Sequence, residues 1–220
     1  RTMAADARCP DRPKTGCACE GAVGSWAMPR LVSYSLSCDE QRRCEHADQF
    51  ELSVSSLRAS NPNIPVVLFS HGPLAPEMAE LCNRFAVMVA DQGPYRDRLA
   101  ALSPRSGDAM LRYPVLHKHL NFAELAAAGA QQVLCCDLDT IFLTDVEVVF
   151  DRYAAPDVVA REEVYSARSM HGVDRAFIDE PLLERLAAHL GRAVVTPFNL
   201  GVVLYNHGVV GRLAGIMATF

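Results

Sequence analysis

The sequence predicts an α/β domain in which helices cover a mostly parallel sheet. Short apolar segments rich in Val, Leu and Ile alternate along the chain with longer segments whose apolar residues recur every three or four positions. These are the patterns of buried strands and of amphipathic helices, and their alternation favours parallel strands joined by helical crossovers. The 220 residues, half of them hydrophobic, suffice for one domain of this class or a large part of one.

We expect residues 1–29 to form an irregular leader or linker and residues 30–220 to form the domain. The leader is rich in Pro, Gly, Ala and Cys and shows no periodicity. The chain begins without an initiator Met or a signal-peptide pattern, and its last residues resemble an unfinished helix. We therefore expect a domain that is truncated at its C-terminus and belongs to a longer protein.

The first part of the domain is expected to alternate strands and helices. Phe50, Val54 and Leu57 recur at helical spacing, and Asp48 is a candidate N-cap for their helix. The turn at residues 61–63, Asn-Pro-Asn, ends that helix. The expected strands span residues 31–36, 64–69 and 86–90, and the expected helices span residues 48–60, 75–85 and 109–128.

The second part continues the alternation. Gly129 and Gly191 each follow a helical pattern and mark the end of a helix. The last strand is apolar but contains Gly201, and a glycine inside a strand often marks close approach of a ligand or of another backbone. The expected strands span residues 133–136, 157–161 and 198–205, and the expected helices span residues 146–153 and 175–190.

Two carboxylates follow the apolar strand at residues 133–136. Asp137 and Asp139 are one residue apart, and residues i and i+2 of a strand point to the same side. In an open α/β sheet the carboxyl end of a strand is where ligands bind. Two hard oxygen ligands suit Mg²⁺ or Mn²⁺ carrying a diphosphate. Two other interpretations remain open: a strand-end turn with solvated acids, and the aspartate nucleophile of a phosphatase.

A second polar site lies in the last strand. Asn199 and Gly201 interrupt the apolar segment at residues 198–206. The amide of Asn199 offers donors and an acceptor, which suits sugar hydroxyls. A bulge capped by Asn199 explains the same residues equally well.

Three segments together resemble the retaining GT-A glycosyltransferases, in particular the glycogenin and galactosyltransferase-like group (family 8-like) and related nucleotide-diphospho-sugar transferases. The first is a helical segment with a basic residue, Lys118, at residues 116–122. The second, at residues 133–146, is similar to the family's strand with Asp-x-Asp and its trailing "DTxxLxD". The third, at residues 198–206, is similar to the family's "FNxGvmlfN". The resemblance covers about residues 31–220 and implies a GT-A, Rossmann-like fold.

The resemblance implies a metal-dependent hexosyltransferase-like enzyme. Asp137 and Asp139 would bind Mn²⁺ (or Mg²⁺) and, through it, the diphosphate of a nucleotide sugar, with a UDP-sugar as the expected donor. Lys118 would lie near the diphosphate or the sugar. The cation would stabilise the charge on the leaving diphosphate, and Lys118 would add a second positive contact. Transfer would proceed with retention, and we nominate no protein nucleophile. The residues expected to act in catalysis are Asp139, Lys118 and Asn199.

The remaining expected site residues bind nucleotide or sugar. Asn199 and Gly201 would line the sugar or acceptor side, and Glu162 lies roughly where an acidic sugar-binding residue falls in the family. The residues expected to bind the nucleotide, besides Lys118, are Ser35, Leu36, Asp39 and Leu138.

The sequence also departs from the family. The family's third metal ligand, a His in a later His-x-x-Gly-x-x-Lys segment, has no counterpart, since His171 comes too early and lacks the Lys. Cys135 and Cys136 replace a bulkier apolar pair. Two alternatives therefore stay open: a haloacid-dehalogenase-like phosphatase using Asp137 as nucleophile and Asp139 as acid/base, and a catalytically inactive, sugar-binding transferase-like domain.

Composition narrows the partners. The net charge of -5 argues against broad binding to nucleic acid or anionic membranes. The eight cysteines lack the Cys-x-x-Cys pairs typical of zinc sites. We expect the partners to be a nucleotide sugar and a glycan, protein or lipid acceptor. A membrane anchor outside this chain, and either the cytoplasm or the Golgi lumen as location, remain open.

Overall fold

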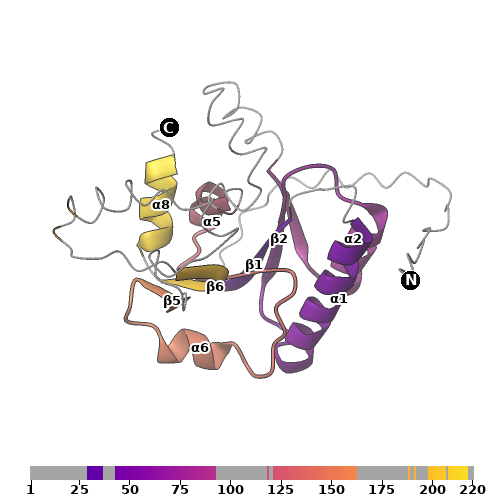
Figure 1. The fold of residues 1–220 in the computed structure, drawn as a ribbon, viewed down its shortest axis with the longest axis horizontal. Coiled ribbons are helices and arrows are strands. Elements are labelled where there is room, and N and C mark those ends of the chain that lie inside the picture. Colours follow the sequence, from indigo (N-terminus) through magenta and orange to yellow (C-terminus); the bar gives the residue numbers. More distant parts are fainter. Residues whose placement is uncertain are drawn as a thin grey trace, which may run out of the picture.

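The computed structural model describes residues 29–36, 43–92, 118, 121–162, 188, 191, 198–206 and 208–217. In this part of the chain one six-stranded sheet has the order β3-β2-β1-β4-β6-β5 (Figure 1). The strands are β1 (Arg30–Leu36), β2 (Val66–Ser70), β3 (Met88–Asp91), β4 (Gln132–Cys136), β5 (Val158–Glu162) and β6 (Phe198–Asn206). The helices are α1 (Arg43–Ser60), α2 (Pro76–Arg84), α5 (Phe122–Ala127), α6 (Glu147–Arg152) and α8 (Val209–Met217).

The sheet is mixed. β1 pairs in parallel with β2 and with β4, and β2 pairs in parallel with β3. β6 runs antiparallel to both β4 and β5. The predicted α/β class is confirmed, and the parallel strands are those of the predicted first half together with β4. The reversed direction of β6 was not predicted, because an apolar strand pattern is the same in either direction.

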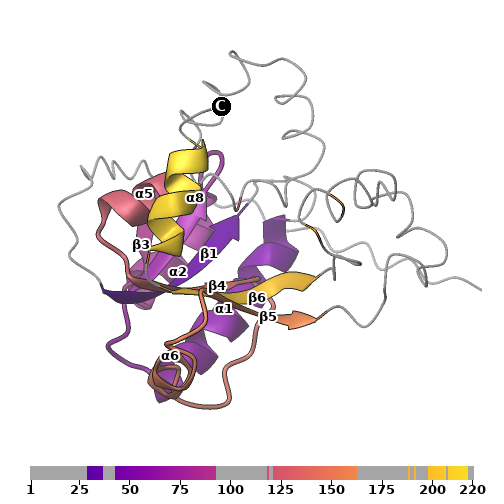
Figure 2. The same cartoon turned by 90° about the vertical axis from the view of Figure 1, so that its left-hand side faces the viewer.

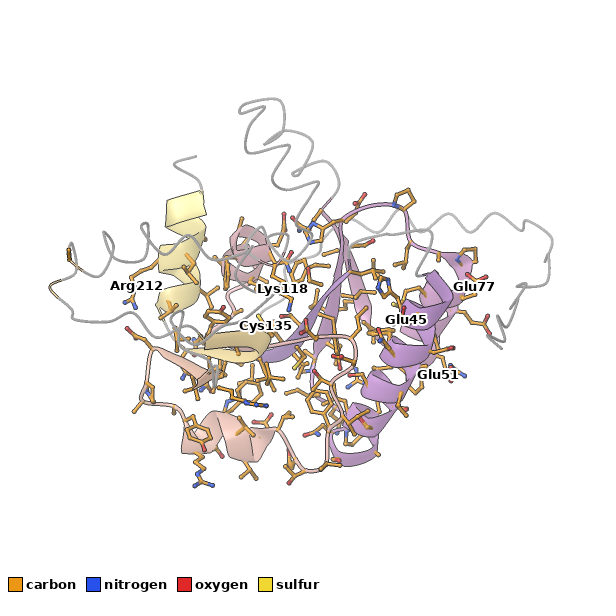
Figure 3. The ribbon with its side chains drawn as sticks, in the orientation of Figure 1. Glu45, Glu51, Glu77, Lys118, Cys135 and Arg212 are labelled. Atoms are coloured by element: carbon orange, nitrogen blue, oxygen red, sulfur yellow. The ribbon has the colours of Figure 1, made fainter. Side chains whose placement is uncertain are left out.

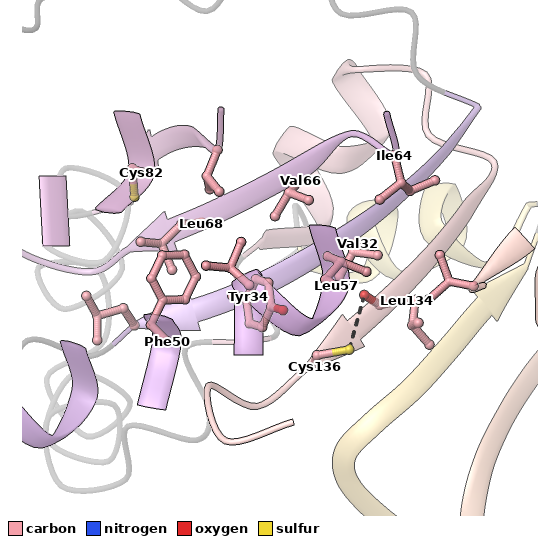
Figure 4. Close-up of a cluster of buried hydrophobic side chains, with 14 of the residues drawn as sticks. Val32, Tyr34, Phe50, Leu57, Ile64, Val66, Leu68, Cys82, Leu134 and Cys136 are labelled. Atoms are coloured by element: carbon pink, nitrogen blue, oxygen red, sulfur yellow. Dashed lines mark hydrogen bonds between the residues drawn. The ribbon is translucent and has the colours of Figure 1, made fainter. Parts of the chain in front are cut away.

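Each face of the sheet has its own core. Val32, Tyr34 and Leu134 pack on one side with α1, α2 and α6. Leu31 and Val133 pack on the other side with α5 and α8. Figure 4 shows the first core, with the Cys136 thiol 3.9 Å from the Leu134 carbonyl oxygen. Figure 2 shows α5 and α8 together on one side of the sheet and α6 on the other. The period-2 alternation along each strand therefore decides which helices it meets.

Helix α1 begins earlier than predicted. Asp48 was the expected N-cap, but α1 starts at Arg43, and Asp48 is an exposed residue in its second turn. Residues 43–47 contain no helix breaker, so the helix extends past the first apolar position. Its predicted end near the turn at residues 61–63 is correct. The other predicted elements agree within a few residues, except that residues 1–28, 109–117 and most of 175–190 lie outside the described part.

The segment after β4 is fastened to the end of α1. The Val146 backbone N–H donates to Asn61 Oδ1 over 2.8 Å, and Asn61 Nδ2 donates to the carbonyls of Thr144 and Leu57. The Phe142 N–H donates to Ser56 Oγ over 3.0 Å. Asn61 is only 5% exposed, so these bonds are shielded from water. The turn residue that ends α1 thereby also fixes the path of the chain that leaves the two acids.

A buried polar network lies at the start of β4, at the opposite end of the strand from the two acids. Gln132 Nε2 donates to Asn206 Oδ1 over 2.7 Å and to the Phe150 carbonyl over 3.2 Å. Asn206 Nδ2 donates to the carbonyls of Tyr153 and Pro156, each over 2.6 Å. Asn206, the last residue of the third motif, is 1% exposed, so it holds β4, β6 and the end of α6 together.

No helix in the described ranges is long and apolar enough to cross a membrane.

Replacing Asn206 with Ala should lower the free energy of unfolding by about 2–4 kcal/mol, because Gln132 Nε2 and two carbonyls would lose their partner inside the fold. Urea denaturation measures this change. The exposed Asn63, replaced with Ala, is the matched control and should change stability by less than about 0.5 kcal/mol. Equal effects of the two substitutions would contradict the structural role of the network.

Candidate functional site

The face of the sheet toward α5 becomes polar at the carboxyl ends of the strands. Leu31, Val67 and Phe69 are apolar and pack with α5 and α8. Further along β1, the alternating positions on this face hold Ser33 and Ser35. On a parallel sheet the carboxyl ends of neighbouring strands meet at one edge, which is where ligands bind in open α/β folds.

Lys118 and Asp137 form an ion pair at this edge. Lys118 Nζ donates to Asp137 Oδ1, although the residues are 19 positions apart. The Lys118 side chain is 17% exposed and the Asp137 side chain is 46% exposed, so the carboxylate reaches solvent while the ammonium is largely enclosed. The structure thus brings the basic residue of the first motif onto the first acid of the second motif.

The third motif meets the same acid through its backbone. The Asp137 N–H donates to the Gly201 carbonyl over 2.7 Å, one step beyond the pairing of Cys136 with Val202. Gly201 is an interior residue of β6, which continues on both sides of it. The glycine therefore lies beside Asp137.

The second acid lies in a turn. β4 ends at Cys136, and the Thr140 N–H donates to the Asp137 carbonyl over 3.1 Å, which closes a turn over residues 137–140. The prediction used strand alternation to place both carboxylates on one side, but that rule stops at the end of β4. Asp139 is exposed, whereas Leu138 is partly buried against the core that packs with α1, α2 and α6. The turn therefore presents Asp139 to solvent and turns Leu138 inward.

Cys135 lies beneath the ion pair. Ser33 Oγ donates to Cys135 Sγ over 3.2 Å, and Figure 3 shows Cys135 close to Lys118 on the α5 side of the sheet. Burial raises the pKa of the Cys135 thiol to about 11, although the Ser33 hydrogen bond and the Lys118 charge both favour the thiolate.

Ser35 has a partner that the sequence analysis missed. His71 follows β2 directly, and its Nε2 lies 3.2 Å from Ser35 Oγ. His71 is 1% exposed, whereas Ser35 is partly exposed. The signal available in the sequence was a histidine two residues after the predicted apolar strand at residues 64–69.

The remaining predicted residues are distributed as follows. Leu36 is 5% exposed in the α1 core, so its side chain faces away from Ser35. Asn199 and Glu162 belong to β6 and β5, and their side chains lie outside the described part of the structure. Asp39 also lies outside it, as does His171.

The donor set of the site fits a hard divalent cation bound jointly with a ligand. Among the described residues no group of three or more His, Cys, Asp and Glu is placed to hold a metal alone. Mg²⁺-type sites often use one or two carboxylates together with substrate phosphates and water. Asp137 and Asp139 supply two carboxylates that are both reachable from solvent.

Comparisons with known proteins identify the fold. No protein-family model matches the chain, and no curated protein matches it in sequence. Mouse xyloside xylosyltransferase 1 in its apo form superimposes with a TM-score of 0.50 at 11% identity, over 84% of this chain and 71% of that one. An active-site mutant of LgtC gives a TM-score of 0.49 at 15% identity, over 80% of this chain and 56% of that one. The predicted GT-A fold is confirmed.

Alkylation should report the raised pKa of Cys135. At pH 8 a thiol with a pKa of about 11 is ionised in roughly one molecule in a thousand, against roughly one in ten at the unshifted value of 9.0. Iodoacetamide should therefore modify Cys135 about 100-fold more slowly in the folded protein than in urea, and the folded rate should keep rising with pH up to about 11. Peptide mass spectrometry measures both rates, and equal rates at pH 8 would contradict the raised pKa of this thiol.

Proposed function

We propose that this GT-A chain is the donor-binding domain of a metal-dependent glycosyltransferase, which moves a sugar from a nucleotide diphosphate to an acceptor. The observation that carries the proposal is the Lys118–Asp137 pair at the carboxyl end of β4, with the exposed Asp139 two residues on. A cation and two carboxylates at this edge match the chemistry of a bound metal diphosphate. The chain spans 71% and 56% of the lengths of the two compared proteins, so the activity proposed is that of the whole enzyme.

The reaction breaks the bond between the anomeric carbon and a phosphate oxygen, and negative charge grows on the leaving diphosphate. Lys118 is suited to receive that charge, because its ammonium is largely enclosed and so interacts more strongly than a solvated one. Asp137 holds the ammonium in place before the ligand arrives. The positive charge is therefore already oriented when the bond breaks.

Asp137 and Asp139 would hold Mn²⁺ or Mg²⁺, and the bound cation would neutralise the leaving phosphates as a Lewis acid. Asp139 has an exposed carboxylate for this purpose. Asp137 would share its two oxygens between the cation and Lys118, which a carboxylate with two acceptor atoms permits.

The finer assignments follow from the motifs. Asn199 and Glu162 would contact the transferred sugar or the acceptor. Gly201, which has no side chain, would allow the sugar or the acceptor to approach the backbone closely. We propose Mn²⁺ as the ion, a UDP-sugar as the donor, retention as the stereochemical course and a glycan as the acceptor class. These assignments rest on the resemblance of residues 133–146 and 198–206 to the transferase motifs.

Replacing Asp139 with Ala should nearly abolish Mn²⁺-dependent nucleotide binding while leaving stability unchanged, because the carboxylate is exposed and supports no core contact. A thermal-shift panel of nucleoside diphosphates and nucleotide sugars, with and without Mn²⁺, measures this loss. Asp157, another exposed carboxylate, paired with Arg212, provides the control when replaced with Ala. Retained Mn²⁺-dependent nucleotide binding in the Asp139 variant would contradict the assignment of Asp139 as a metal ligand.

Replacing Lys118 with Gln should lower turnover by about 10²–10³-fold, more than it weakens donor binding, because the lost charge matters most as the diphosphate leaves. The rate at which the bound nucleotide sugar is consumed measures the effect. The matched control is Arg212→Gln, which removes an exposed cation from α8 and should leave the rate unchanged. A wild-type chain that binds the nucleotide sugar without consuming it would point to a binding domain instead.

A further inference from the structure

The carboxyl end of β2 places His71 where it can act on the predicted nucleotide site. The His71 N–H donates to the Leu36 carbonyl over 3.0 Å, which extends the β1–β2 pairing beyond the last strand pair, Leu36 with Ser70. Ser70 Oγ donates to the Gly72 carbonyl over 2.6 Å and fixes the turn that follows. The His71 backbone is therefore held firmly against β1.

The imidazole lies on the same face of the sheet as the ion pair. Ser35 alternates along β1 with Leu31, which packs with α5 and α8, and the imidazole contacts Ser35, so it lies on that face. Its Nε2 lies 3.2 Å from Ser35 Oγ, and the residue is 1% exposed. His71 is thus too enclosed to touch a ligand itself, and any effect on a ligand passes through Ser35.

Ser35 is the member of the pair that reaches solvent and lies next to Asp137 in the sheet. The four residues before it in β1 are buried, whereas Ser35 is partly exposed. In the β1–β4 register, Tyr34 pairs with Cys136, so Ser35 and Asp137 come next on the two strands. Neighbouring strands lie about 4.8 Å apart, which places the hydroxyl within reach of a nucleotide whose phosphates lie at Asp137.

We infer that His71 is a positioning residue for the nucleotide: its hydrogen bond to Ser35 fixes the orientation in which the Ser35 hydroxyl is presented to the nucleoside. A serine hydroxyl alone rotates and can donate or accept. The bond to the imidazole takes up either the O–H or one lone pair and so stops this rotation. This inference rests on the proposed nucleotide-sugar site and adds to it a residue that acts through Ser35 without touching the ligand.

A double-mutant cycle separates this role from simple stabilisation. Isothermal titration in the presence of Mn²⁺ would measure the Kd of UDP for the wild type, Ser35→Ala, His71→Leu and the double variant. We expect each single variant to weaken binding about fivefold, as for loss of one hydrogen bond, and the double variant to be no worse than Ser35→Ala. His71→Gln, which keeps a polar group near the position of Nε2, should restore binding to within about twofold of the wild type.

The control is Ser53→Ala, which removes another buried hydroxyl hydrogen bond, to the Tyr34 hydroxyl at 2.9 Å, on the opposite face of the sheet. It should leave the Kd unchanged. If His71→Leu does not fold, His71→Gln and Ser35→Ala still decide the matter: an unchanged Kd in Ser35→Ala overturns the inference. Additive effects of Ser35→Ala and His71→Leu on the Kd would also overturn it.

Nucleotide analogues identify the group that Ser35 contacts. If Ser35→Ala weakens the binding of UDP but not of 2′-deoxy-UDP, the contact is with the ribose. If the loss of affinity caused by Ser35→Ala differs among UDP, GDP and CDP, the contact is with the base. Either result supports the inference. Binding that Asp137→Ala abolishes but Ser35→Ala leaves intact overturns this inference alone. Absence of nucleotide binding in the wild type overturns the proposed function as well.

Discussion

The pairing of β4 with β1 on one side and β6 on the other is the constraint from which the site follows. β4 is hydrogen-bonded in parallel to β1 and antiparallel to β6, so three segments far apart in the sequence are in register at its end. This register places Ser35 next to Asp137 and sets the Gly201 carbonyl against the Asp137 N–H. A shift of one residue would turn every side chain of β4 to the other face, so both cores resist it.

The two ends of β4 use polar groups in opposite ways. At its start, Gln132 and Asn206 are buried and bonded to each other and to nearby carbonyls, which joins β4, β6 and α6 into a rigid frame. At its end, the polar groups are partly exposed: Asp137 is half-exposed and Asp139 is exposed. Buried groups bonded to one another stabilise the fold, whereas groups open to solvent remain available to a ligand.

The two faces of the sheet make different contacts with the chain at the end of β4. On the α1 side, Asn61 and Ser56 fasten the chain that follows the acids, and Leu138 and Phe142 pack against the core. On the α5 side, Lys118 reaches Asp137 above Cys135. The turn at residues 137–140 is thus held from the α1 face, while the ion pair lies on the α5 face. Preorganisation of this kind is what a site needs if its charges are not to reorient during reaction.

The sequence by itself determined the α/β class, most strand and helix positions, and the three segments that meet at the site, because hydrophobic periodicity and local turn chemistry are written in neighbouring residues. It also pointed to Asp137, Asp139, Lys118 and Gly201. Only the tertiary structure decided the direction of β6, the ion pair between Lys118 and Asp137, the inward orientation of Leu36 and the contact of His71 with Ser35. These depend on the order and register of strands, and residues that meet across a sheet can be far apart in the chain.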